Sequence, residues 1–169
     1  MMRRFILFIG VVMAVVVSVS GQKDGDSVRD FHLLLKHTVP LISVEQLAEE
    51  LPKNPSIIML DTRKKAEYRV SHIKNARFVG YRGFNLKSVI DIPLETPIVV
   101  YCSLGVRSER IGKKLENAGF KNVRNLLGGM FEWFNRGHPV YDKTGRPTSR
   151  VHGYSREWSK WLRRGEKVF

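Results

Sequence analysis

The stretch that decides the fold runs from residue 98 to residue 108 and reads IVVYCSLGVRS. Its first four residues are continuously apolar, which is typical of a strand that is buried on both faces of a parallel sheet. Apolar residues then recur at helical spacing until Gly119 interrupts them. The stretch therefore predicts a buried strand, a short loop and a helix over residues 106–118.

The flanking sequence continues this alternation of strands and helices. Ser43 and Gln46 form the N-terminal capping signal of a helix that Pro52 ends. Further strands are predicted at residues 57–60, 76–79 and 122–126, and further helices at 44–51, 64–70 and 130–135. The alternation predicts an α/β fold, a small doubly wound parallel sheet flanked by helices, with a ligand site beyond the carboxyl ends of the strands.

Cys102 follows the predicted buried strand directly, and it is the only cysteine of the chain. A thiol at this place faces the N–H groups of the loop and the positive end of a helix dipole, and Arg107 adds a full charge. These features favour the thiolate, which is the nucleophilic form of cysteine. Gly105 permits the backbone conformations that a loop needs to curl around an anion. A lone cysteine is otherwise a small buried hydrophobe, but this combination predicts a reactive site.

The loop pattern C-x-x-G-x-R-S resembles the active loop of the rhodanese family of sulfurtransferases. Three further landmarks occur in the family's order: an Asp-x-Arg strand end, an aromatic-x-x-Gly-His-Ile-x-Gly-Ala segment and a Gly-Gly-x-x-x-Trp segment. The matching residues are Asp61 and Arg63, Tyr68 with residues 71–76, and Gly128, Gly129 and Trp133. The resemblance covers residues 39–141 and implies a rhodanese-like fold. Ser71 and Asn75 depart from the pattern, which has glycine at both positions, and this concerns local backbone shape more than activity.

The resemblance implies a sulfurtransferase of the thiosulfate sulfurtransferase (rhodanese) type that needs no cofactor. Cys102 would take sulfane sulfur from a small anionic donor such as thiosulfate, become a persulfide and pass the sulfur to a thiol, cyanide or a protein acceptor. The loop amides and the Arg107 guanidinium would stabilise the donor, the thiolate and the persulfide. The substrate-binding residues would be Ser103, Leu104, Gly105, Val106, Arg107 and Ser108.

Three other arginines are candidates for further contacts with the anion: Arg63, Arg77 and Arg82. The alternative for each is a solvated or salt-bridged surface side chain, and for Arg63 the specific partner would be Glu67, four residues later. We expect Asp61 to fix the backbone at the strand end. We expect His72 to make structural hydrogen bonds rather than to act as a base.

Two other functions stay open on the sequence. Cysteine phosphatases use the pattern C-x5-R to wrap a phosphoryl group, whereas four residues separate Cys102 from Arg107, so this loop is one residue shorter. The second alternative is a non-catalytic rhodanese-like module of the cell envelope that carries sulfur or binds a protein. The cysteine favours catalysis, because an inactive copy is expected to lack it.

The N-terminus has the pattern of a secretory signal. Two arginines precede an apolar run at residues 5–17, and Ser18 and Ser20 supply the small residues that a signal peptidase requires. We predict a signal peptide over residues 1–20 and an exported protein, periplasmic or secreted. An uncleaved membrane anchor is the alternative, although the run is shorter than the roughly 20 residues that span a bilayer as a helix.

The chain of 169 residues is basic, with 29 Lys and Arg against 16 Asp and Glu and a formal charge of +13. Export argues against nucleic acid as the partner for this charge and favours anionic small molecules or phospholipid head groups. One cysteine and five histidines without metal-binding spacing predict no metal site.

Two segments flank the predicted rhodanese-like domain: an N-terminal extension over residues 21–38 and a basic C-terminal tail over residues 142–169. In the tail, Trp158, Trp161 and Leu162 have the spacing of one helix face, which predicts a short amphipathic helix. Such a helix would either contact an anionic membrane surface or pack on its own domain.

Overall fold

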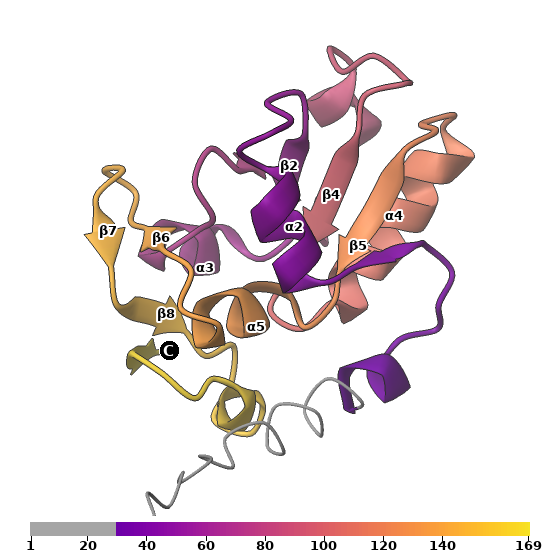
Figure 1. Cartoon of the computed structure of the whole chain (residues 1–169). Coiled ribbons are helices and arrows are strands. Elements are labelled where there is room, and N and C mark those ends of the chain that lie inside the picture. Colours follow the sequence, from indigo (N-terminus) through magenta and orange to yellow (C-terminus); the bar gives the residue numbers. More distant parts are fainter. Residues whose placement is uncertain (1–29) are drawn as a thin grey trace, which may run out of the picture.

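The computed structural model describes residues 30–169 (Figure 1), so the predicted signal peptide and residues 21–29 lie outside the described residues. Five parallel strands form the main sheet in the order β1-β5-β4-β2-β3. The strands are β1 (Leu41–Ile42), β2 (Ile58–Asp61), β3 (Arg77–Phe78), β4 (Ile98–Tyr101) and β5 (Val123–Leu126). The predicted fold class, a small parallel sheet flanked by helices, is confirmed.

Strand β4 is buried on both faces, which explains its continuously apolar sequence. Ile98 and Val100 belong to one core cluster, which includes side chains of the helix α4 (Val106–Asn117). Val99 and Tyr101 belong to the other cluster, which includes side chains of α2 (Val44–Glu50) and α5 (Gly129–Asn135). Helices therefore cover both faces of the sheet, as Figure 1 shows.

Local signals set where the helices begin. The Ser43 hydroxyl accepts a hydrogen bond from the Gln46 N–H, and the Gln46 side chain accepts one from the Ser43 N–H, which confirms the predicted cap of α2. The short helix α3 occupies Lys65–Val70. Gly105 and Gly128 precede α4 and α5 in the left-handed conformation, which costs glycine the least. Both helices thus begin within a few residues of the carboxyl end of a strand.

The described part of the N-terminal extension packs on the domain. Residues 30–34 are helical, and the Phe31 side chain is fully buried. The Glu109 carboxylate on α4 accepts hydrogen bonds from the N–H groups of Lys36 and Thr38, over 3.0 and 2.8 Å.

A 3-10 helix, η1 (Leu86–Val89), was not predicted and lies between β3 and β4. No helix among residues 30–169 is long and apolar enough to cross a membrane.

The C-terminal tail differs from the prediction, because it has no α-helix. Two small two-stranded sheets pair β6 (Val140–Tyr141) with β7 (Pro147–Thr148), and β8 (Arg150–His152) with β9 (Glu166–Val168). The chain has to return to place β9 beside β8, and only one turn of 3-10 helix, η2 (Trp158–Trp161), forms between them. Leu162 is fully buried, and Trp158 and Trp161 pack against the core cluster of α2 and α5. These three apolar residues of the tail therefore pack on its own domain.

Candidate active site

Cys102 lies at the carboxyl end of β4 and is 2% exposed. The Gly105 N–H donates a hydrogen bond to Cys102 Sγ over 3.1 Å. Gly105 has a φ of +109°, in the region that favours glycine, and this conformation turns its N–H back toward the sulfur. The loop thus wraps the thiol from β4 to the first turn of α4.

Opposing effects act on the acidity of the thiol. Burial raises the pKa of Cys102, and the positive charge of Arg107 lowers it. The backbone N–H groups of Leu104 and Ser108 lower the pKa further. The net pKa lies below the usual value of a cysteine, so the thiolate is favoured. This direction agrees with the expectation from the sequence.

The cysteine loop packs against the start of α5 at the Gly128-Gly129 pair. The Met130 N–H donates to the Cys102 carbonyl over 2.8 Å, and the Phe131 N–H donates to the Ser103 carbonyl over 3.1 Å. A Cβ atom on Gly129 would come within 2.3 Å of the Cys102 carbonyl oxygen. Only glycine lets α5 begin this close to the loop, which gives the Gly-Gly motif a structural role in the site.

Asn125 supports the other side of the loop. Its side-chain amide donates to the Gly105 carbonyl over 3.0 Å, and its Oδ1 accepts a hydrogen bond from the Ser108 hydroxyl over 2.7 Å. All three residues are buried or nearly so, and β5 carries Asn125 beside β4. The sequence analysis missed Asn125, a polar residue within a predicted strand.

The Arg107 guanidinium is bound in an ion pair with Glu67 of α3. Two hydrogen bonds of 2.8 Å join its terminal nitrogens to the two carboxylate oxygens, and a third of 3.0 Å reaches the Ser103 hydroxyl. Burial raises the pKa of Glu67, but Arg107 and the charge of Arg63 outweigh it and lower the pKa to about 2. The sequence analysis missed this pairing, because it assigned Glu67 to Arg63.

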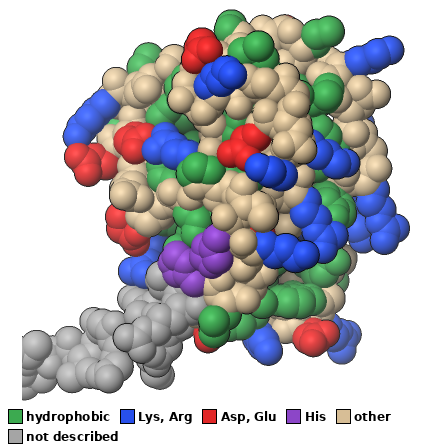
Figure 2. Space-filling view, turned by 90° about the vertical axis from the view of Figure 1, so that its right-hand side faces the viewer, with side chains coloured by type: hydrophobic (Ala, Val, Ile, Leu, Met, Phe, Trp, Pro, Cys, Tyr) green, Lys and Arg blue, Asp and Glu red, His purple; other side chains and the backbone are tan. Residues whose placement is uncertain are grey.

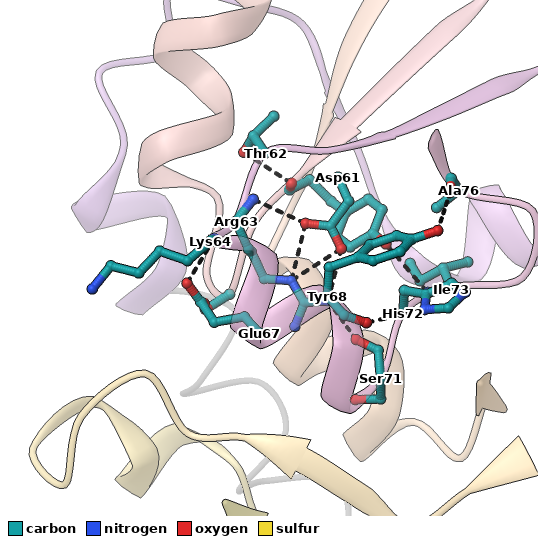
Figure 3. Close-up of polar contacts among 12 residues, drawn as sticks. Asp61, Thr62, Arg63, Lys64, Glu67, Tyr68, Ser71, His72, Ile73 and Ala76 are labelled. Carbon is teal, nitrogen blue, oxygen red and sulfur yellow. Dashed lines mark hydrogen bonds and ion pairs between the residues drawn. The ribbon is translucent and has the colours of Figure 1, made fainter. Parts of the chain in front are cut away.

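Arg63 is fully buried, so the alternative of a surface ion pair with Glu67 is wrong, whereas its role as an anion contact stays a prediction. Its guanidinium donates to the Asp61 carboxylate over 2.7 Å and to the Ser71 carbonyl over 2.6 Å (Figure 3). The Asp61 carboxylate also accepts the Arg63 N–H over 2.9 Å, which is the backbone role expected for it. The Arg63 side chain is buried because it joins the end of β2, through Asp61, to the end of α3, through the Ser71 carbonyl.

Ser71 and Asn75, which follow α3, stand where the family pattern has glycine, and their backbone conformations explain why other residues fit there. Ser71 has extended backbone, which any residue adopts, whereas Asn75 has a φ of +60°, in the region that favours glycine. Asn tolerates this conformation better than most residues. The His72 ring stacks on Tyr68 with 4.1 Å between centroids, and its Nδ1 lies 3.1 Å from the Tyr68 carbonyl. These are the structural contacts expected of His72.

The other two candidate arginines have different surroundings. Arg77 forms an ion pair with Asp91 of 2.7 Å on the surface, which is the salt-bridged alternative to an anion contact. Arg82 lines a groove of about 510 Å³, which we call the basic groove because six cations line it: Arg63, Lys64, Lys65, Arg82, Arg107 and Arg110. The basic groove shares Val106, Arg107 and Tyr154 with the pocket over Cys102. Figure 2 shows Lys and Arg side chains gathered on part of the side that α4 forms.

A smaller cavity, the cysteine pocket, lies over Cys102. It has a volume of about 150 Å³ and is lined by Cys102, Ser103, Leu104, Val106, Arg107, Tyr154 and Trp158. Of the six loop residues predicted to surround the sulfur, four line the pocket, and Gly105 donates its N–H to the sulfur. The sixth, Ser108, is buried behind them. Tyr154 and Trp158 come from the tail, and the sequence analysis did not place either residue at the site.

Comparisons with known proteins agree with this geometry. Residues 43–136, more than half of the chain, match the rhodanese-like domain family. The chain therefore belongs to the family of rhodanese-like domains, which includes sulfurtransferases.

Individual relatives support this assignment. The thiosulfate sulfurtransferase GlpE of Coxiella burnetii is 35% identical over 95 residues, 56% of this chain and 87% of that protein. The adenylyltransferase and sulfurtransferase uba4 of Ogataea parapolymorpha is 30% identical over 100 residues, but the chain spans only 25% of its length. The solution structure of a polysulfide-sulfur transferase homodimer from Wolinella succinogenes has a TM-score of 0.54 and 27% identity, covering 73% of this chain and 92% of that one.

Proposed function

We propose that this protein is an exported single-domain sulfurtransferase that moves sulfane sulfur from a donor to a thiophilic acceptor through a persulfide on Cys102. The observation that carries the proposal is the environment of the thiol, which has a lowered pKa and accepts the Gly105 N–H over 3.1 Å. The similarity to a thiosulfate sulfurtransferase supports thiosulfate as one donor.

In the first step, the Cys102 thiolate attacks the outer sulfur of thiosulfate. A bond forms between this sulfur and Cys102 Sγ, the S–S bond of the donor breaks, and its electron pair leaves with sulfite. The sulfur moves without a change in oxidation level, so no external oxidant or reductant takes part. The N–H of Gly105, already directed at Sγ, stabilises the negative charge throughout this step.

In the second step, a thiophile attacks the outer sulfur of the persulfide. The S–S bond to Cys102 breaks, and its electron pair returns to Sγ, which regenerates the thiolate. With cyanide the product is thiocyanate, and with a thiolate it is a new persulfide. The basic groove beside the site supports an anionic acceptor, because its cations raise the local concentration of anions.

Export is the part of the proposal that depends on the sequence alone. Its support is the basic, apolar and small-residue pattern of residues 1–20. Expression of the full chain with its own leader, followed by N-terminal sequencing of the protein from the extracytoplasmic fraction, should return a chain that starts at Gly21. Recovery of the intact chain in the membrane fraction would support the uncleaved anchor.

Turnover separates the enzyme from a non-catalytic module. The purified protein should form thiocyanate from cyanide and thiosulfate or an organic thiosulfonate, and the Cys102→Ser variant should form none. The variant is a matched control because a hydroxyl replaces the thiol at nearly equal volume. A folded wild-type protein with a titratable thiol that forms no thiocyanate from either donor would favour the sulfur-carrier or binding module.

A further inference from the structure

The C-terminal tail supplies part of the cysteine pocket, although it lies beyond the residues that match the family. The match ends at residue 136, whereas Tyr154 and Trp158 line the cavity over Cys102. The remaining lining residues come from the cysteine loop and the start of α4. The pocket of this chain is therefore built from the family domain and from a segment added to it.

Tyr154 is held in place by its surroundings. Its φ of +65° lies in the left-handed region, which is unfavourable for a bulky residue. The Tyr154 N–H donates to His152 Nδ1 over 3.0 Å, and its ring lies over the Arg107 guanidinium at 4.7 Å. A costly conformation persists only where the neighbouring contacts determine it. The ring of Tyr154 is thus a fixed part of the pocket rim.

Trp158 is held by the packing of the tail onto the domain. Leu162, at the end of the same turn, is fully buried, and Trp161 packs on Phe31 with 5.4 Å between ring centroids. The Asn135 side chain of α5 donates to the Trp161 carbonyl over 2.8 Å and accepts the Arg163 N–H over 2.8 Å. These contacts preform the wall that Trp158 gives to the pocket.

The chemistry of the pocket favours a donor with an apolar group. Most of its non-cysteine lining is apolar or aromatic: Leu104, Val106, Tyr154 and Trp158. Among its seven described lining residues Arg107 is the only cation, and its charge is already compensated by Glu67. A compact dianion such as thiosulfate gains little from these walls. An apolar cavity of about 150 Å³ is large enough to hold benzene.

We propose that the tail makes this active site selective for sulfane-sulfur donors that carry an apolar group, of which an aryl thiosulfonate is the simplest. The inference rests on the proposed function and specifies the donor. The Cys102 thiolate attacks the terminal sulfur of the thiosulfonate, and a bond forms to Sγ. The bond from that sulfur to the sulfonyl sulfur breaks, and its electron pair leaves with the sulfinate. The aryl group of the donor lies against Trp158 and Tyr154 during this step.

The test compares two donors of equal charge in one protein. Persulfide formation on Cys102 is followed at increasing concentrations of benzenethiosulfonate and of methanethiosulfonate, and the ratio of their kcat/KM values is taken. We expect the wild-type ratio to favour the aryl donor by about tenfold, after division by the ratio of their rates with free cysteine. The Trp158→Ala variant should bring this corrected ratio near one, and Trp158→Phe should keep part of it.

Lys160→Ala is the matched control, because it shortens an exposed side chain of the same turn that does not line the pocket. It should leave both the melting temperature and the corrected ratio close to those of the wild type. Because the kcat/KM values of both donors are measured on the same variant, a partly unfolded population lowers both equally and leaves their ratio unchanged.

Two results would overturn the inference. A wild-type ratio near one, or a ratio that Trp158→Ala leaves unchanged, contradicts donor selection by the tail while persulfide formation still supports the proposed function. If a folded protein with a titratable thiol forms no persulfide with either thiosulfonate and none with thiosulfate, the proposed function and the inference are both overturned.

Discussion

The Asp61–Arg63 pair is closed to solvent on both sides, whereas in the Glu67–Arg107 pair the carboxylate is closed and the arginine is 15% exposed toward the cysteine pocket. Both pairs use two-point contacts between a guanidinium and a carboxylate, with shortest distances of 2.7 and 2.8 Å. Arg63 is 0% exposed and also binds the Ser71 carbonyl, which belongs to the framework. Arg107 also binds the Ser103 hydroxyl, which belongs to the cysteine loop.

An arginine of the family pattern is therefore not by itself a substrate contact. A buried guanidinium without a carboxylate costs several kcal/mol, so an arginine beside a buried partner is fixed by that partner first. The Asp61–Arg63 pair, the framework pair, then shapes the chain, and the Glu67–Arg107 pair, the site pair, sets the electrostatics of the thiol. Variants of the two pairs should therefore differ in whether they change the stability of the fold or the acidity of the thiol.

Breaking the framework pair should have the largest effect. Arg63→Ala leaves the Asp61 carboxylate buried and unpaired, and we expect the free energy of unfolding to fall by about 3–5 kcal/mol. Urea denaturation measures the loss. Arg77→Ala is the control, because its pair with Asp91 is exposed and screened by solvent, so its loss of stability should be much smaller. Equal losses in the two variants would contradict the framework role.

Moving the cysteine loop should have the next largest effect. Gly129→Ala places a Cβ atom 2.3 Å from the Cys102 carbonyl oxygen, and we expect about 3 kcal/mol of destabilisation from the clash and the left-handed backbone. Gly145→Ala shares a positive φ but has open space around it, so it should cost only about 1 kcal/mol. Thermal unfolding and persulfide formation measured on both variants check this. Similar behaviour of the two would show that the close approach of α5 is unimportant.

Glutamine can keep hydrogen bonds at either position of the site pair, so these variants should mainly shift the pKa of the thiol, which is the smallest effect in energy. Arg107→Gln removes the positive charge that lowers the pKa of Cys102, so this pKa should rise. Glu67→Gln removes the carboxylate that compensates this charge, so the pKa should fall. The pH dependence of thiol alkylation by iodoacetamide measures both. Shifts of the same sign in the two variants would contradict the assignment.

The fold could be predicted from the sequence because its signals are local and strong. The run over residues 98–101 is buried on both faces, and the capping residues Ser43 and Gln46 act within one turn. The position of Cys102 at the end of β4 and the turn at Gly105 follow from the same stretch. Each of these features depends on residues close together in the chain.

The partners of the arginines could not be predicted, because they depend on how distant segments meet. Glu67 on α3 and Arg107 on α4 lie forty residues apart in the chain and meet because their helices follow the neighbouring strands β2 and β4. The tail shows the same limit: its apolar spacing fits an α-helix, but the pairing of β8 with β9 leaves one 3-10 turn. The same apolar residues could therefore be predicted to be buried, but not to line the pocket.

The central claim is that Cys102 carries sulfur as a persulfide, and the intact mass of the protein tests it most directly. Wild-type protein and the Cys102→Ser variant are treated with thiosulfate and, in parallel, with benzenethiosulfonate, and then desalted without reductant. We predict a gain of one sulfur atom in the wild type with at least one donor, and none in the variant. No gain from either donor, in a folded protein whose thiol still titrates, would contradict the claim, as would an equal gain in the variant.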